Sequence, residues 1–232
     1  MRRAAFVFAG FLATAQPVFS GPWARDPGAV FLSYSLNLDS EFEEFDLTPY
    51  HSIYGEFGLG RRLTLGADIG GDEATSQGSG FLRYTLTRNA AVWQFAGDIG
   101  VGWRAVDGAE TAQMLRVGAS VGRGFGRDRF DWVPWVDPEG GWFSVDAYTL
   151  LDPDGDQTLW QAEATLGIVL SARTGAMVQA KVEEYPDAEM AAFISPSLLV
   201  YFGEDTTLRL GGRVSVAGTQ EAGLQIGLWR EF

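Results

Sequence analysis

The sequence of 232 residues contains no cysteine and a single histidine, His51. The absence of cysteine excludes a disulfide-stapled secreted domain, and it suits an oxidising periplasm, where a stray thiol is a hazard. After residue 20, no stretch approaches the roughly 20 consecutive apolar residues that a transmembrane helix needs. If the chain spans a membrane, it must do so with strands that close into a barrel.

Positive charge is also scarce. The chain has 17 Lys and Arg residues against 30 Asp and Glu residues, and its formal net charge is −13. An acidic chain offers no groove for a polyanion, so we expect no nucleic-acid partner. Acidic stretches such as residues 39–46 are typical of solvated loops, and nothing in them imposes the geometry of a cation site. We therefore expect no metal site and no cofactor.

The first twenty residues have the pattern of a Sec-type signal peptide. Arg2 and Arg3 precede an uncharged run over residues 4–15, and small residues suitable for cleavage follow. Cleavage after Ala15 and cleavage after Ser20 both fit, and the second is preferred. The uncharged run is too short for a membrane anchor. We expect residues 1–20 to be removed and residues 21–232 to form one domain.

The last residues alternate between apolar and polar or small side chains. Counting back from Phe232 in steps of two gives Arg230, Leu228, Ile226 and Leu224, and the residues between them are small or polar except for one tryptophan. This period of two is typical of a strand with one apolar face and one wet face. A chain that ends with an aromatic residue on such a strand resembles the bacterial outer-membrane β-barrels, whose final strand is read by the assembly machinery.

A second region carries the same resemblance. Residues 54–59 (Tyr-Gly-Glu-Phe-Gly-Leu) and residues 62–66 (Arg-Leu-Thr-Leu-Gly) are similar to hairpins of uncharacterised proteobacterial outer-membrane proteins. The resemblance implies a Gram-negative outer membrane as the location, with outer-membrane lipid, lipopolysaccharide and the assembly machinery as partners. The mean hydropathy of −0.01 agrees with side chains that alternate between lipid and lumen.

The pattern of alternation predicts an all-β fold, a closed antiparallel up-and-down transmembrane β-barrel of about twelve strands, the even number that such barrels require. The segment 132–150 is less regular than the others. The expected strands are residues 29–38, 50–58, 63–71, 80–87, 92–104, 114–125, 132–150, 158–170, 177–185, 193–202, 207–217 and 222–232. Short turns at 60–62, 88–89, 126–129, 171–175 and 203–205 would face the periplasm, and the more acidic junctions would face outward.

Assigning alternate residues to the two faces places charges of both signs in the lumen. These charges could form a structural network of ion pairs or line a selective conduction path, and the sequence leaves both open. The lumen candidates are Glu56, Asp68, Arg83, Asp98, Arg104, Arg116, Glu163, Lys181, Glu183, Arg209 and Arg213.

The tryptophans have two possible roles. Trp93 and Trp103 are ten residues apart on one expected strand, so their rings could anchor its two membrane interfaces as part of an aromatic girdle. Trp132, Trp135 and Trp142 belong to the less regular segment. They belong to the same girdle if the segment stays in the wall, and they form an aromatic constriction if it folds inward. The girdle is the preferred interpretation.

Lipid-modifying barrels place a histidine and a serine together on the outer surface. His51 is followed directly by Ser52, and adjacent strand residues point to opposite faces, so the pair does not meet this requirement. We expect no catalytic residue and no enzyme. The favoured function is a passive, porin-like pore or small-solute transporter with a narrow charged lumen, whose solute the sequence does not indicate. A structural or surface-interaction barrel with an occluded lumen is the alternative, and a lipid-modifying enzyme comes third.

Overall fold

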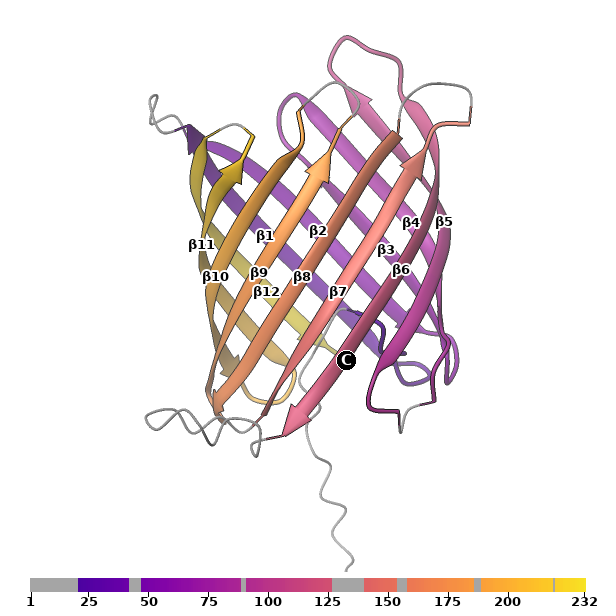
Figure 1. Ribbon diagram of the computed structural model, residues 1–232, viewed down its shortest axis with the longest axis vertical. Helices are drawn as coiled ribbons and strands as arrows, with labels where there is room; N and C mark the ends of the chain where they lie inside the picture. Colours follow the sequence, from indigo (N-terminus) through magenta and orange to yellow (C-terminus); the bar gives the residue numbers. More distant parts are fainter. Residues whose placement is uncertain are drawn as a thin grey trace, which may run out of the picture.

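The computed structural model describes residues 21–41, 47–88, 91–126, 140–153, 158–185, 189–218 and 220–232. Within these ranges the chain forms twelve strands (Figure 1). Their bounds are β1 Val30–Glu41, β2 Thr48–Gly58, β3 Leu63–Gly71, β4 Thr75–Thr85, β5 Gln94–Val106, β6 Ala112–Gly126, β7 Gly140–Leu151, β8 Thr158–Ser171, β9 Thr174–Glu184, β10 Ala191–Phe202, β11 Thr206–Ala217 and β12 Glu221–Glu231. No helix in the described part of the chain is long and apolar enough to cross a bilayer.

Every strand pairs with its neighbours in the sequence, and the first pairs with the last. The order around the sheet is β1-β12-β11-β10-β9-β8-β7-β6-β5-β4-β3-β2, and it closes into a barrel with antiparallel pairing throughout. β1 and β12 pair from Phe31–Glu231 to Glu41–Glu221. Phe232 extends the seam, because its N–H donates to the carbonyl oxygen of Val30 at 2.9 Å. The predicted closed barrel of twelve antiparallel strands is confirmed.

Alternation along the strands separates the two faces of the wall. Large apolar side chains such as Leu65, Ile99 and Leu228 lie on the outside, where they are 45%, 67% and 47% exposed. The residues between them point into the barrel and are mostly buried there. This arrangement gives every strand a face for hydrocarbon and a face for the interior, as membrane barrels require.

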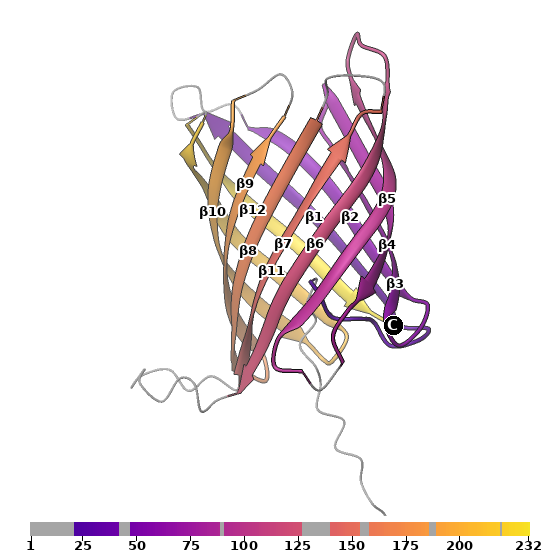
Figure 2. The same cartoon turned by 45° about the vertical axis from the view of Figure 1, so that its right-hand side comes forward.

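The two ends of the barrel differ, and both are visible in the two views (Figures 1 and 2). The terminal rim carries residues 21–29, Phe232 and the turns at 59–62, 86–88, 91–93, 172–173 and 203–205. The acidic rim, at the opposite end, carries the described connections at 47, 72–74, 107–111, 152–153, 185, 189–190, 218 and 220. The strands are tilted steeply against the long axis, as expected for a closed barrel.

One strand starts five residues before the position that the sequence predicts. β4 begins at Thr75 and not at residue 80, because residues 75–79 are small or polar on both faces and so hide their alternation. These residues are strand because they pair with β3 and β5. β7 begins at Gly140, and residues 132–139 of the predicted segment 132–150 lie outside the described residues.

One glycine on the inner face makes room for an aromatic ring. Gly66 pairs with Phe81 across β3 and β4, and a Cβ at Gly66 would lie 2.1 Å from Phe81 Cζ. We expect Gly66→Ala to lower the free energy of unfolding by about 1–3 kcal/mol, the usual cost of overpacking a filled interior. Gly80→Ala is the control, because nothing lies within 4 Å of a Cβ there. Urea unfolding in lipid vesicles measures both, and equal stabilities would contradict the packing.

Candidate functional site in the barrel interior

All eleven predicted lumen residues point into the barrel. Their strands place them there by alternation, with the apolar residues on either side of them facing outward. Buried in the interior are Glu56, Arg83, Asp98, Arg116, Glu183 and Arg209. Half-buried there are Asp68, Arg104, Glu163, Lys181 and Arg213.

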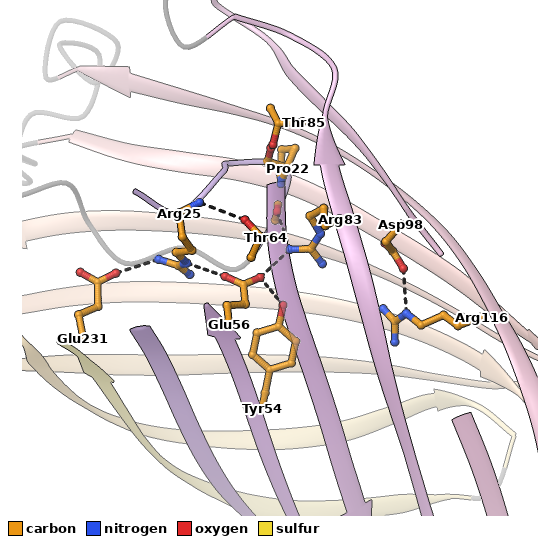
Figure 3. A network of polar contacts seen from close by, with 11 residues as sticks. Pro22, Arg25, Tyr54, Glu56, Thr64, Arg83, Thr85, Asp98, Arg116 and Glu231 are labelled. Atoms are coloured by element: carbon orange, nitrogen blue, oxygen red, sulfur yellow. Dashed lines mark hydrogen bonds and ion pairs between the residues drawn. The ribbon is translucent and has the colours of Figure 1, made fainter. Parts of the chain in front are cut away.

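The first cluster of charges lies near the terminal rim and centres on Glu56 of β2 (Figure 3). Its Oε1 accepts a hydrogen bond from Arg83 Nη1 at 2.6 Å and another from the Tyr54 hydroxyl, while its Oε2 accepts from Arg25 Nε at 2.5 Å. Arg25 also pairs through Nη1 with Glu231 Oε1 at 2.8 Å. Two guanidinium groups and two carboxylates therefore balance one another at this end of the barrel.

The chain before β1 enters this cluster. Arg83 Nη1 donates to the carbonyl oxygen of Gly21 at 2.8 Å, and the Thr85 hydroxyl donates to that of Pro22 at 2.9 Å. The backbone N–H of Arg25 donates to Thr64 Oγ1 at 3.2 Å. Pro22 is among the most completely buried residues of the described chain. Sequence reasoning missed this segment and Arg25, because residues 21–29 have no strand period by which their side chains could be placed.

Beside the charges lies an apolar cluster, which also occupies the interior near the terminal rim. Trp142 of β7, Met177 of β9 and Leu199 of β10 are at most 3% exposed and form its centre. Trp23, Tyr201 and Trp229 pack around them. Trp142 therefore lies inside the barrel and not in an outer girdle. Gly167 leaves the space for its ring, since a Cβ at Gly167 would lie 2.1 Å from Trp142 Cη2.

The middle of the interior is organised around Arg116 of β6. Its Nε donates to Asp98 Oδ1 at 2.8 Å, and its Nη1 donates to Ser79 Oγ at 2.9 Å. The guanidinium carbon lies 4.2 Å from the centre of the Phe81 ring and 4.0 Å from that of the Tyr148 ring. Arg116 is thus held by charge, by hydrogen bonds and by two aromatic faces.

Arg209 and Glu163 are bound differently from the other buried charges. Arg209 of β11 donates to Ser197 Oγ at 2.9 Å and to Gln225 Oε1 at 2.6 Å, both neutral groups. Glu163 of β8 accepts from Gln179 Nε2 at 2.5 Å. The hydrogen bonds that each makes in the described chain go to neutral side chains.

A chain of charges lies nearer the acidic rim. Lys181 Nζ is 2.7 Å from Glu183 Oε2, Glu183 Oε1 is 3.8 Å from Arg213 Nη2, and Arg213 Nη1 is 2.8 Å from Asp39 Oδ2. Tyr185, just after β9, donates its hydroxyl to Glu183 Oε2 at 3.3 Å. Burial, and then the charge of Glu183, raise the pKa of the Tyr185 phenol. The phenol therefore stays a neutral donor to the carboxylate.

The remaining polar candidates lie at the same level of the barrel. The guanidinium carbon of Arg104 is 5.3 Å from the centre of the Tyr185 ring. Asp68 lines a small cavity together with Gln77, Ser79 and Tyr148. An apolar cluster of Met114, Leu150 and Leu159 packs beside these groups. In the described residues no group of three or more acidic or histidine side chains is arranged to hold a metal ion.

Charge is distributed unevenly between the two rims. The described connections of the acidic rim carry six acidic residues and no basic residue; the acidic residues are Asp72, Glu73, Asp107, Glu110, Asp152 and Glu189. The described turns of the terminal rim carry both signs: Arg61, Arg62, Arg88 and Arg173 together with Glu204 and Asp205. A mouth lined by one sign of charge concentrates ions of the opposite sign.

The outer surface carries the other predicted residues. Trp93 is 42% exposed just before β5, and Trp103 lies near the other end of the same strand, over Gly78 of β4. Phe232 is 63% exposed at the terminal rim. Trp132 and Trp135, like the signal peptide over residues 1–20, lie outside the described residues.

The outer surface also carries the single histidine. His51 Nδ1 lies 2.8 Å from the Tyr34 hydroxyl. His51 is exposed and the neighbouring Ser52 is not, as expected for adjacent residues of a strand that point to opposite faces. The serine and the histidine are therefore not combined on one surface.

No protein-family model matches the chain, and no curated protein matches its sequence. Among solved structures, the chain is similar to the KdgM porin, with 6% sequence identity and a TM-score of 0.55 over 87% of this chain and 99% of that chain. The KdgM porin in complex with disordered oligogalacturonate matches with the same values. An outer membrane channel from Pseudomonas putida F1 matches with 11% identity and a TM-score of 0.57, over 93% of this chain and 100% of that chain. At these identities the similarity shows a shared barrel fold.

Proposed function

We propose that the chain is a passive pore of the Gram-negative outer membrane, with a narrow charged lumen that favours small cations or small cationic solutes. The observation that carries this proposal is the series of charged side chains inside the barrel. It runs from Asp39 and Arg213 near the acidic rim to Glu56 and Arg83 near the terminal rim. Burying charges is costly even when they are paired, so an interior with only a structural role has little need of so many.

The preference for cations follows from the acidic rim. Its uniform negative charge raises the local concentration of cations and repels anions before they reach the lumen. The KdgM porin has been captured with oligogalacturonate, an acidic oligosaccharide. The same cargo does not suit this chain, because its six described acidic loop residues would repel it. The outer-membrane location implies lipid, lipopolysaccharide and the assembly machinery as partners, with Phe232 on the last strand as the assembly signal.

A structural barrel with an occluded lumen is the second candidate, and a specific observation favours it. The apolar cluster around Trp142 and the segment that carries Pro22 and Trp23 fill much of the interior near the terminal rim. Under this alternative the charges are a network of ion pairs that only hold the strands together. Conductance separates the two candidates, because an interior that is permanently filled carries no current.

The test is single-channel conductance of the refolded protein in a planar bilayer, with the reversal potential measured under a salt gradient. We expect steady conductance, from the wild type or from a variant that lacks residues 22–26, and a cation-selective reversal potential. Arg209→Ala should change the conductance, because it removes a positive charge from the lumen. The hydrogen-bond partners of Arg209 are neutral, so the ion pairs elsewhere in the interior stay intact. A correctly folded barrel that never conducts, even with residues 22–26 deleted, would contradict the pore.

The role of the acidic rim has a separate prediction. Neutralising Asp72, Glu73, Asp107 and Glu110 together, as Asn or Gln, should shift the reversal potential toward the non-selective value, because the field at that mouth is removed. Glu204→Gln with Asp205→Asn is the control, since these acids lie at the rim that carries both signs. An unchanged reversal potential in the first variant would contradict cation attraction by the acidic rim.

A further inference from the structure

Residues 21–29 cross the interior of the barrel from one wall to the opposite wall. A Cβ at Gly21 would lie 3.4 Å from Ser144 Cβ on β7. At the other end of the segment, the N–H of Gly28 donates to the carbonyl oxygen of Gly58 at 2.8 Å, and β1 begins at Val30. β7 and β1 are six positions apart in a ring of twelve strands, so they face each other across the lumen. Figures 1 and 2 show the segment inside the lower end of the barrel.

The segment is held in place by side chains of the wall and not by strand pairing. Three of its backbone groups bind Arg83, Thr85 and Thr64. The side chain of Arg25 adds ion pairs to Glu56 and Glu231. Backbone hydrogen bonds join the chain to the sheet from Gly28 onward. The segment before Gly28 can therefore leave the lumen without breaking the sheet.

The segment and the apolar cluster pack against each other in one layer of the barrel interior. Trp23 packs against the cluster of Trp142, Met177 and Leu199. On β6, Gly122 lies directly beside the segment, since a Cβ there would be 2.6 Å from Trp23 Cη2 and 3.0 Å from Pro22 Cγ. This layer therefore contains residues of the terminal segment together with residues from several strands of the wall.

We propose that residues 21–26 form a plug that closes the terminal end of the lumen, and that the pore conducts fully only when this plug leaves its seat. The inference rests on the proposed pore function and adds its regulation. Glu56 is the latch, because its carboxylate binds Arg25 of the plug and Arg83 of the wall together. The plug is part of the chain itself, so no partner is needed to close the pore.

The first experiment tests whether the plug is seated. Because the chain has no cysteine, a thiol reagent reports only on an introduced one. Pro22→Cys places the thiol at a buried position and Pro27→Cys places it at an exposed position of the same segment. In detergent micelles, we expect a bulky maleimide to label Pro22→Cys at least about tenfold more slowly than Pro27→Cys, because the buried thiol reacts only when the segment opens. Equal rates would overturn the plug.

The second experiment tests whether the plug controls conduction. Two variants remove it in different ways, so that a folding failure in one leaves the other. One deletes residues 22–26, and the other is the double substitution Trp23→Ala with Arg25→Ala. We expect a several-fold larger conductance than that of the wild type for both. Arg230→Ala is the matched control, because it removes an exposed arginine of the same rim that stacks on Phe232 and should leave the conductance unchanged.

The outcomes separate the plug from the pore. Equal, steady conductance in the wild type and in both variants would overturn the plug and leave the pore function standing. Folded barrels that are silent both with and without the plug would overturn both proposals. A wild type that is closed or weakly conducting, together with variants that conduct, supports both.

Discussion

Glu56→Gln is expected to lower the free energy of unfolding by about 3–5 kcal/mol, the cost of removing one partner from a buried ion pair. The Glu56 side chain is 1% exposed and forms ion pairs with both Arg25 and Arg83. Glutamine keeps the shape and one oxygen acceptor, but it leaves the buried guanidinium of Arg83 without the carboxylate that pairs with it, and it removes one of the carboxylates that pair with Arg25. The phenol of Tyr54 also loses a charged acceptor. Urea unfolding in lipid vesicles, followed by tryptophan fluorescence, measures the loss.

Glu231→Gln is the matched control for Glu56→Gln. Glu231 also pairs with Arg25, but its side chain is 34% exposed, so its loss should cost at most about 1 kcal/mol. A double variant of Glu56→Gln with Arg83→Gln should lose less than the sum of its single changes, because the second change removes a charge that the first left unpaired. Equal losses for Glu56→Gln and Glu231→Gln would show that Glu56 is not the centre of the cluster.

Arg116→Leu is expected to cost about 3–5 kcal/mol of stability, because it leaves the buried carboxylate of Asp98 without its partner. The Arg116 guanidinium also contacts the faces of the Phe81 and Tyr148 rings. These cation–π contacts contribute about 0.5–2 kcal/mol, and leucine, which has no charge, does not replace them. Arg116→Lys should fall between the wild type and Arg116→Leu, since lysine keeps the charge but loses the planar fork that binds Asp98 and Ser79 together.

Arg123→Leu on the same strand is the control for Arg116→Leu. Arg123 lies over the ring of Trp93 at 5.7 Å on the outer face, and the loss of such a contact costs about 0.5–1 kcal/mol. The same unfolding measurement compares the two arginines. If Arg116→Leu is no more costly than Arg123→Leu, the interior at Arg116 is more open to water than its burial indicates.

The strands could be predicted because an alternation with a period of two depends only on residues that are neighbours along the chain. For most of them the predicted and observed ends differ by at most three residues, since apolar and polar residues alternate clearly up to the turns. It failed at the start of β4, where residues 75–79 offer no contrast between the faces. It also did not decide whether Trp142 points outward or into the lumen, because the sequence before β7 does not alternate regularly between apolar and polar residues.

The same period places the eleven lumen candidates, but it does not predict their partners. Glu56 and Arg83 are 27 residues apart and meet across the inner surface of β3, a contact that depends on the register of two strand pairs. Arg209 is hydrogen-bonded to neutral groups although carboxylates are present in the same interior. Such choices depend on side-chain rotamers and on the stagger of the closed barrel.

The sequence by itself determined the class of fold, the number of strands and the face on which most side chains lie. Each of these depends on the alternation of neighbouring residues along one strand, which is a local property. Only the tertiary structure decided which charges pair, that Trp142 lies inside, and that residues 21–26 occupy the lumen beside Glu56. The physical reason is that these contacts join residues far apart in the chain, and closure of β1 on β12 brings their walls to opposite sides of one narrow space.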